Sequence, residues 1–141
     1  MSANTAESLF WDDLAEDLKD PDFLRDYVRE SIRISTIDQI VTDLNTARLS
    51  AKLSKAALAR AINAEPAVVR RLFSAGHVNP TLGTLAEVAA ALGLRVTLEP
   101  LPVTDRDHIT KSLVNGQTAR PLAVAKHVSR MRKPKREQVA S

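Results

Sequence analysis

Cysteine is absent from this chain of 141 residues, and aromatic residues make up only 4% of it. Without cysteine the protein has no disulfide, no thiolate zinc site and no cysteine nucleophile, and nothing ties it to an oxidising compartment. Glycine is also scarce, with four residues, whereas alanine, leucine and valine are plentiful, which favours small helices over sheets. The length suits one domain and leaves little for a second.

Long apolar runs are missing as well. None reaches the length of a membrane span, and the N-terminal residues lack the basic-then-apolar order of a secretion signal, because Glu7, Asp12 and Asp13 accompany the apolar residues there. We therefore expect a soluble, cytoplasmic protein with no membrane partner.

The residue patterns of common active sites are also absent. The sequence has no P-loop, no glycine fingerprint for dinucleotides and no Ser-His-Asp set. Its three histidines, His77, His108 and His127, lie far apart in the sequence, and only His108 is loosely flanked by aspartates. We expect neither a catalytic site nor a metal site, and no cofactor.

Charge is unevenly distributed along the chain, although the overall net charge is only +3. Residues 1–30 carry a net charge of −6, residues 31–100 carry +3, and residues 101–141 carry +6. Such an asymmetry is typical of proteins that bind nucleic acid or another protein.

Apolar residues recur at helical spacing over most of the first hundred residues. The spacing predicts helices over residues 9–18, 21–33, 36–49, 55–62, 66 to about 76, and 82–92. Thr36, Ser54 and Thr81 are placed to cap three of these helices, and Pro21 and Pro66 suit the first helical position of two others.

The period changes after Gly93. Residues 94–99 alternate apolar and polar side chains, which predicts a half-buried strand that ends at Pro100. This strand has no partner within the chain, so its edge is expected to pair with another copy, with a partner protein or with water. Beyond it the pattern weakens to a short helix between Ala119 and Met131 and a basic run.

The predicted fold class is all-α, a bundle of five to six helices with a helix-turn-helix core, one short C-terminal strand and a basic flexible tail. The predicted organisation is an acidic helical segment over residues 1–35, a DNA-binding domain over 36–100 and a largely flexible tail over 101–141. The central prediction depends on residues 53–98, where two short helices flank a tight turn and Ala59 allows them to cross closely. Periodicity alone would fit any small helical bundle.

Three stretches of this region resemble the XRE family of helix-turn-helix proteins, which includes Cro and the phage repressors. They are residues 57–62 (ALARAI), 69–72 (VRRL) and 79–94 (NPTLGTLAEVAAALGL). Residues 20–27 (DPDFLRDY) and 94–100 (LRVTLEP) resemble the HigA-type antitoxins within it. The resemblance implies a homodimer that binds a palindromic operator in double-stranded DNA, binds a ribonuclease toxin and represses its own operon.

The sequence departs from this family at several positions. Asn63 stands where many relatives have glycine, Phe73 where they have glutamate, and the loop before Pro80 is one residue longer. At the start of the recognition helix, polar base-reading residues are replaced by Glu65, Pro66, Ala67 and Val68. Base readout is therefore expected to depend on Arg70 and Arg71, with Ala67 and Val68 contacting thymine methyl groups.

Contacts to the phosphate backbone are expected from two regions. Ser54 and Lys55 match the start of the helix that braces across the phosphates, and His77 and Asn79 lie in the loop that runs beside the backbone in relatives, although a lone loop histidine is more often simply solvated. The basic tail would add Lys126, Arg130, Arg132, Lys133, Lys135 and Arg136.

Several alternatives stay open from the residues alone. The protein can be a free-standing or phage-type repressor without a toxin, or an interaction adaptor whose helix-turn-helix is vestigial. The acidic segment either covers the bundle as a solvated helix or docks on a basic toxin. The basic tail either keeps the protein in solution or binds phosphates.

Overall fold

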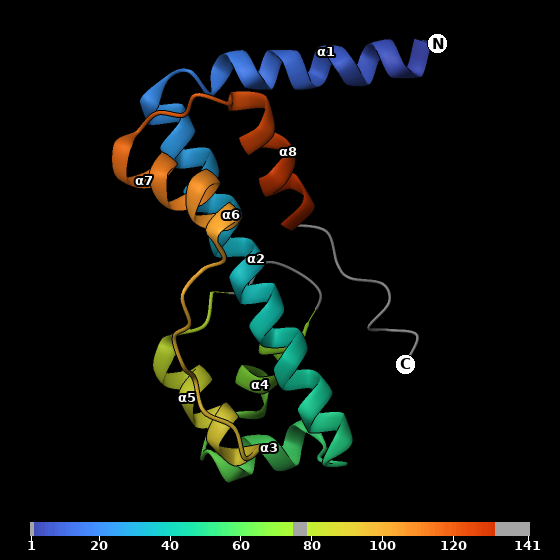
Figure 1. Cartoon of the computed structure of the whole chain (residues 1–141). Helices are drawn as coiled ribbons and strands as arrows, with labels where there is room; N and C mark the ends of the chain where they lie inside the picture. The colour runs from blue at the N-terminus through green and yellow to red at the C-terminus, as the bar shows by residue number, and fades with distance from the viewer. Residues whose placement is uncertain (1, 75–78, 132–141) are drawn as a thin grey trace. The chain divides into compact units, whose positions relative to one another are not determined.

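A computed structural model of the chain describes residues 2–74 and 79–131. Residues 36–99 form one compact unit, and the described residues among 1–35 and 100–141 form another. The described parts are all-α, with seven helices when the continuous run over residues 103–115 is counted as one (Figure 1). No helix in these parts is both long and apolar enough to span a bilayer.

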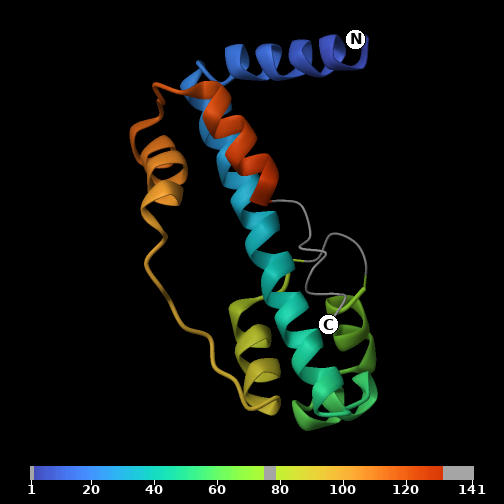
Figure 2. The same cartoon turned by 45° about the vertical axis from the view of Figure 1, so that its right-hand side comes forward.

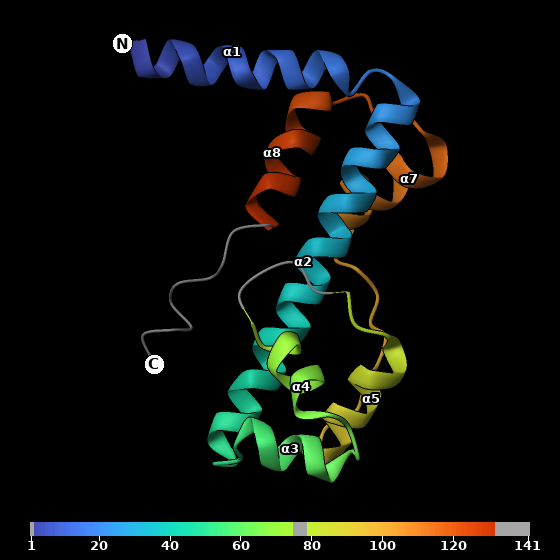
Figure 3. The same ribbon diagram turned by 180° about the vertical axis from the view of Figure 1, so that it is seen from behind.

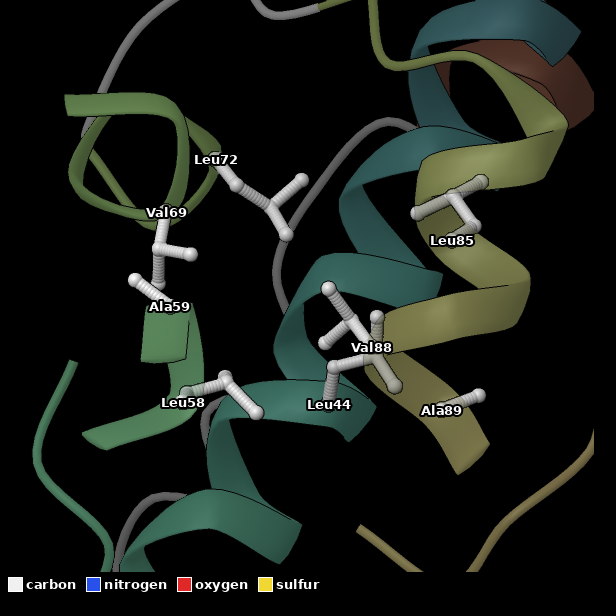
Figure 4. Packing of buried hydrophobic residues seen from close by; sticks show 8 residues of the cluster. All are labelled: Leu44, Leu58, Ala59, Val69, Leu72, Leu85, Val88 and Ala89. Atoms are coloured by element: carbon white, nitrogen blue, oxygen red, sulfur yellow. The ribbon is translucent and has the colours of Figure 1, made fainter. Parts of the chain in front are cut away.

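The unit of residues 36–99 contains the second half of α2 (Pro21–Ser50), followed by α3 (Lys55–Ala61), α4 (Pro66–Leu72) and α5 (Leu82–Ala91). All four helices contribute to one apolar core (Figure 4). Its buried members are Leu44, Leu58, Ala59, Val69, Leu72, Leu85, Val88 and Ala89. Because α3 and α4 have only seven residues each and would not be stable as isolated helices, this shared core holds them in place.

Helix α2 corrects the expectation of two helices separated near residue 35. No glycine or proline lies between residues 22 and 50, so no residue there interrupts the helical backbone. Ser35 donates its hydroxyl to the carbonyl of Ile32 at 3.2 Å, within the helix. Thr36 lies inside this helix and does not cap one, and the bond of Ser35 shows how a hydroxyl side chain fits a helix interior.

The other unit joins both ends of the chain. It contains α1 (Ser2–Asp17), the first part of α2, α6 (Val103–Asp105), a π-helical turn η1 (Arg106–Thr110), α7 (Lys111–Asn115) and α8 (Pro121–Met131). Its core is formed by Leu18, Leu24, Val28, Ile109, Val124, Ala125 and Val128, with α1 packed against α8 (Figure 1).

The expectation of a largely flexible tail over residues 101–141 is therefore wrong for residues 103–131. Ile109, Val124 and Val128 are at most 3% exposed, and they bury apolar surface against α1 and α2. The apolar side chains of α8 do recur at helical spacing, with Val124, Ala125 and Val128 on one face, but this pattern does not show which helices the face packs against. The short helix foreseen between Ala119 and Met131 is confirmed as α8.

The strand expected over residues 94–99 is not present. Figure 2 draws the chain after α5 as plain coil, and no strand occurs in the described residues. Alternating side chains create strand propensity, but a strand forms only when its backbone groups pair with a neighbour. Within the described part of this chain no such neighbour is available to residues 95–99.

Candidate nucleic-acid interface

Helix α3 begins at a side-chain cap. The backbone N–H of Ala57 donates to Oγ of Ser54 at 3.0 Å, as the sequence predicts for an N-cap serine. The hydroxyl still has its own proton, so Ser54 can both hold the helix start and donate to an anion. Lys55 follows as the first residue of α3 and is half-buried.

The turn between α3 and α4 requires a left-handed residue, and Asn63 supplies it with φ of +53°. Around it the N–H of Ile62 donates to the carbonyl of Leu58 at 3.3 Å, and the N–H of Ala64 donates to that of Ala59 at 2.9 Å. These bonds satisfy carbonyls that the end of α3 would leave free. Asparagine tolerates this backbone better than most residues, so it can occupy a turn position that would otherwise favour glycine. The turn joins α3 to α4 in Figure 3.

Helix α4 begins with Pro66 at a position where a missing N–H costs nothing. Its buried face is set by Val69 and Leu72, which are 0% and 4% exposed. Because successive helical residues are rotated by about 100°, the opposite face of α4 presents Ala67, Arg70 and Arg71. Two arginines thus flank a small residue on the side of α4 that faces away from the core.

These arginines are free to bind a ligand. Both are exposed, and no carboxylate among the described residues forms an ion pair with either of them. Glu65 is the nearest acid in the sequence; it lies at the start of α4 and makes no capping bond. A guanidinium without an internal partner keeps all its donors for phosphates or for guanine edges.

Another arginine of this unit has a structural role. The guanidinium of Arg48 lies 5.5 Å from the centre of the Phe73 ring and donates to the carbonyl of Leu53 at 2.9 Å. It also donates to Oδ1 of Asn45. Arg48 thereby ties the end of α2 to the end of α4, with the Phe73 ring as the surface on which it stacks.

The remaining predicted DNA contacts fall into three groups. Ala67 and Val68 are half-buried, while Glu65, Pro66 and Asn79 are exposed. Lys126 and Arg130 are exposed on α8, in the other unit, where the Lys126 ammonium lies 5.9 Å from the Trp11 ring centre. The others, His77, Arg132, Lys133, Lys135 and Arg136, lie outside the described residues. The contacts predicted on α3 and α4 thus belong to one unit, in which these two helices pack against each other.

Comparison with family models, curated proteins and solved structures finds no match to this chain. The XRE and antitoxin resemblance therefore depends on the residues themselves and on the helix order they produce.

A second polar cluster lies in the other unit and was missed from the sequence. Asp105 and His127 are joined by a hydrogen bond of 2.7 Å between Oδ1 and Nε2, and the ring of His108 lies 4.7 Å from that of His127. Burial, and then the neighbouring His127, lower the pKa of His108. The two bonded residues are 22 positions apart, so no local spacing could have revealed them.

This cluster supports the fold rather than a metal site. In the described ranges no group of three His, Cys, Asp or Glu side chains is arranged to hold a metal ion. An open cleft of about 720 Å³ beside His108 is lined by polar side chains including Lys111 and Arg120, but Lys111 is paired with Asp107 at 3.1 Å. The Asp105–His127 bond links α6 to α8 and so fixes the C-terminal helices to each other.

Proposed function

We propose that residues 36–99 form a helix-turn-helix domain that binds double-stranded DNA, with α4 in the major groove, and that the protein represses transcription. The observation that carries the proposal is the face of α4 that presents Arg70 and Arg71 beside Ala67, with no ion-pair partner for either arginine among the described residues. Two arginines on the second helix of such a pair can reach guanine edges, while the small alanine permits close approach to the bases.

The start of α3 offers groups suited to phosphate contacts. Ser54 and Lys55 present a hydroxyl, free backbone N–H groups and a cation at the beginning of the first helix of the pair. Phosphate contacts of this kind fix a protein on the duplex without reading its sequence. With two base-reading arginines in each copy, much of the affinity must come from phosphate contacts and from binding as a dimer to a palindromic site.

The decisive experiment replaces both arginines. Arg70→Ala combined with Arg71→Ala should weaken binding to the protein's own promoter fragment at least about tenfold, because a good arginine–guanine contact contributes about 1–3 kcal/mol. Binding is measured by fluorescence anisotropy at a fixed salt concentration, together with repression of a promoter–reporter fusion.

A charge-matched control separates readout from general attraction. Arg29→Ala with Arg33→Ala removes the same charge from exposed positions in the other unit, where each arginine pairs with an acid one helical turn away. This control should change affinity much less. If the Arg70–Arg71 variant keeps its helix content and binds as tightly as the parent, the DNA-binding assignment is wrong and the adaptor alternative gains support.

We extend the proposal to an antitoxin that binds a basic toxin through α1. The resemblance to HigA-type proteins motivates this step, and one observation favours it over a free-standing repressor. Leu9 and Phe10 are 57% and 59% exposed on α1, next to the acids Asp12 and Asp13. An apolar pair with adjacent negative charge suits a cationic partner.

The test for a toxin uses surface substitutions. Removing residues 1–30 would also remove the core residues Leu18, Leu24 and Val28, so it would unfold the unit and prove nothing about docking. Leu9→Asp with Phe10→Asp should instead abolish co-purification with the product of an adjacent gene, while Leu49→Asp, at an exposed position of the other unit, should preserve it. An unchanged complex with the α1 variant would remove α1 from the toxin site.

A further inference from the structure

We propose that residues 94–100 pair with the same segment of a second copy as an antiparallel two-stranded ribbon centred on Thr97. The apolar residues of this segment, Leu94, Val96 and Leu98, are 46%, 41% and 98% exposed. Their spacing of two places them on one face of an extended chain. A fully exposed leucine in such a row indicates a surface that another chain covers.

The backbone of the segment is available for pairing. Leu94 donates its N–H to the carbonyl of Ala89 at 2.8 Å, and Pro100 has no N–H. Between them, residues 95–99 make no backbone hydrogen bond to any described residue. The available donors therefore begin after Leu94 and end before Pro100.

These two ends limit the registers that can form, and one that they allow is centred on Thr97. In an antiparallel pair, opposed residues alternate between those that exchange two hydrogen bonds and those that exchange none. Centring the pair on Thr97 places Leu94 opposite Pro100 of the second copy at a position that needs no N–H. Thr97 then exchanges bonds with its own equivalent, and Arg95 exchanges bonds with Glu99. All the donor positions of the ladder fall on residues whose N–H groups are free.

Side-chain charge favours the same register. Arg95 lies directly opposite Glu99 of the second copy, and symmetry repeats this pair on the other side of Thr97. Both side chains are exposed, and neither has an ion-pair partner in the described ranges. Shifting the centre by one residue to Val96 would oppose Arg95 to Thr97. It would also require the N–H of either Gly93 or Leu94, which already donate to the carbonyls of Ala90 at 3.0 Å and Ala89 at 2.8 Å.

The occupant is therefore a second copy of this chain, because the segment is complementary to itself in charge and in hydrogen bonding. This inference deepens the proposed function and rests on it for one point only, namely that a palindromic operator requires a two-fold symmetric dimer. The pairing supplies such a two-fold axis at the end of the DNA-binding unit.

Cross-linking tests the register in the full-length protein. The chain has no cysteine, so a single introduced cysteine gives an unambiguous product. Thr97→Cys should form an intermolecular disulfide under mild oxidation, since directly opposed Cα atoms lie about 5.5 Å apart. Val96→Cys or Leu98→Cys alone should cross-link several times more slowly, whereas a mixture of the two should form the heterodimer. Equal rates for the three single variants, or no product with Thr97→Cys, would overturn the register.

A charge reversal tests the pairing without oxidation. Arg95→Glu places like charges opposite each other twice and should raise the dimer dissociation constant about tenfold, measured by sedimentation without DNA. Arg95→Glu combined with Glu99→Arg restores both pairs and should return the constant to near the parent value. A double variant as weak as the single one, or a monomeric parent, overturns the pairing. A monomer that still needs Arg70 and Arg71 to bind DNA would overturn this inference and leave the proposed function standing.

Discussion

Ser54 is the residue on which the geometry of the proposed interface depends most directly. Its hydroxyl accepts the N–H of Ala57 at 3.0 Å and so holds the first turn of α3. We expect Ser54→Ala to destabilise the unit of residues 36–99 by about 1 kcal/mol, as measured for other helix caps. Hydrogen exchange of the Ala57 amide, followed by NMR, should speed up, and Ser54→Asp should restore most of the protection. Unchanged exchange in Ser54→Ala would show that the cap contributes little.

His108 gives the other unit a predictable response to pH. Burial and the adjacent His127 lower the pKa of His108, Arg120 and Arg130 act in the same direction, and Asp107 opposes them. The unfolded chain therefore binds a proton at higher pH than the folded one, and stability is lost as the pH falls from about 6.5 towards the lower folded pKa. Above this window His108 is neutral in both states and the effect disappears.

We therefore expect the unit that contains His108 to unfold at lower urea concentration at pH 5.5 than at pH 8. Fluorescence of Trp11, the one tryptophan of the chain, reports this unit because Trp11 packs on its core. His108→Gln should reduce the difference between the two pH values. If the variant shows the same difference in urea midpoint between pH 5.5 and pH 8, groups other than His108 cause the pH dependence of stability.

At the scale of helices, the end of α7 depends on a contact from α2. Arg25 donates from Nε to the carbonyl of Leu113 at 3.0 Å and from Nη2 to that of Val114 at 3.2 Å. Gly116 ends the helix with φ of +71°, and a Cβ there would lie 2.8 Å from the Arg25 guanidinium carbon. The glycine thus provides both the left-handed turn and the space for the arginine.

We expect Gly116→Ala to destabilise this unit by roughly 1–2 kcal/mol, because alanine is strained at positive φ and would displace the guanidinium. The control is Gly93→Ala, which has a similar φ of +77° but no atom within 4 Å of the added Cβ. Urea unfolding followed by Trp11 fluorescence for the first variant, and by circular dichroism for both, separates backbone strain from displacement of Arg25. If both variants lose the same free energy of unfolding, the Arg25 side chain moves away from the added methyl group without cost.

The helices differ in how far their own sequence determines them. Ser54, Pro66 and Thr81 mark the starts of α3, α4 and α5 correctly, since caps act within one turn. The continuation of α2 through Ser35 and Thr36 was not predictable, because hydroxyl residues suit both a helix cap and a helix interior. The segment over residues 94–99 has strand periodicity but no strand, since pairing requires a neighbouring strand that the described residues do not supply.

At the scale of the whole molecule, the acidic and basic ends of the sequence do not form separate parts. The acidic first 35 residues and the described part of the basic C-terminal region belong to one unit, with Lys126 placed over Trp11. This association depends on contacts between residues about a hundred positions apart, for which a single sequence offers no local signal. Helical periodicity could identify α1 and α8 separately but not their packing against each other.

The same association changes how the basic tail should be tested for DNA binding. A deletion starting at residue 126 would remove Val128 from the core of its unit, so weakened binding would be uninterpretable. A chain that ends after Met131 keeps α8 complete and still removes four of the predicted phosphate contacts, Arg132, Lys133, Lys135 and Arg136.

We expect this shorter chain to bind the promoter fragment with a shallower salt dependence. Each phosphate contact contributes a slope of about −0.9 to the logarithm of affinity against the logarithm of salt concentration, so the slope should become less negative by about 3 to 4 if all four residues engage. Replacing the same four residues by alanine in the full-length chain should give the same slope, because the effect comes from charge. An unchanged slope in both proteins would leave the phosphate contacts to the helix-turn-helix unit alone and assign the tail to solubility.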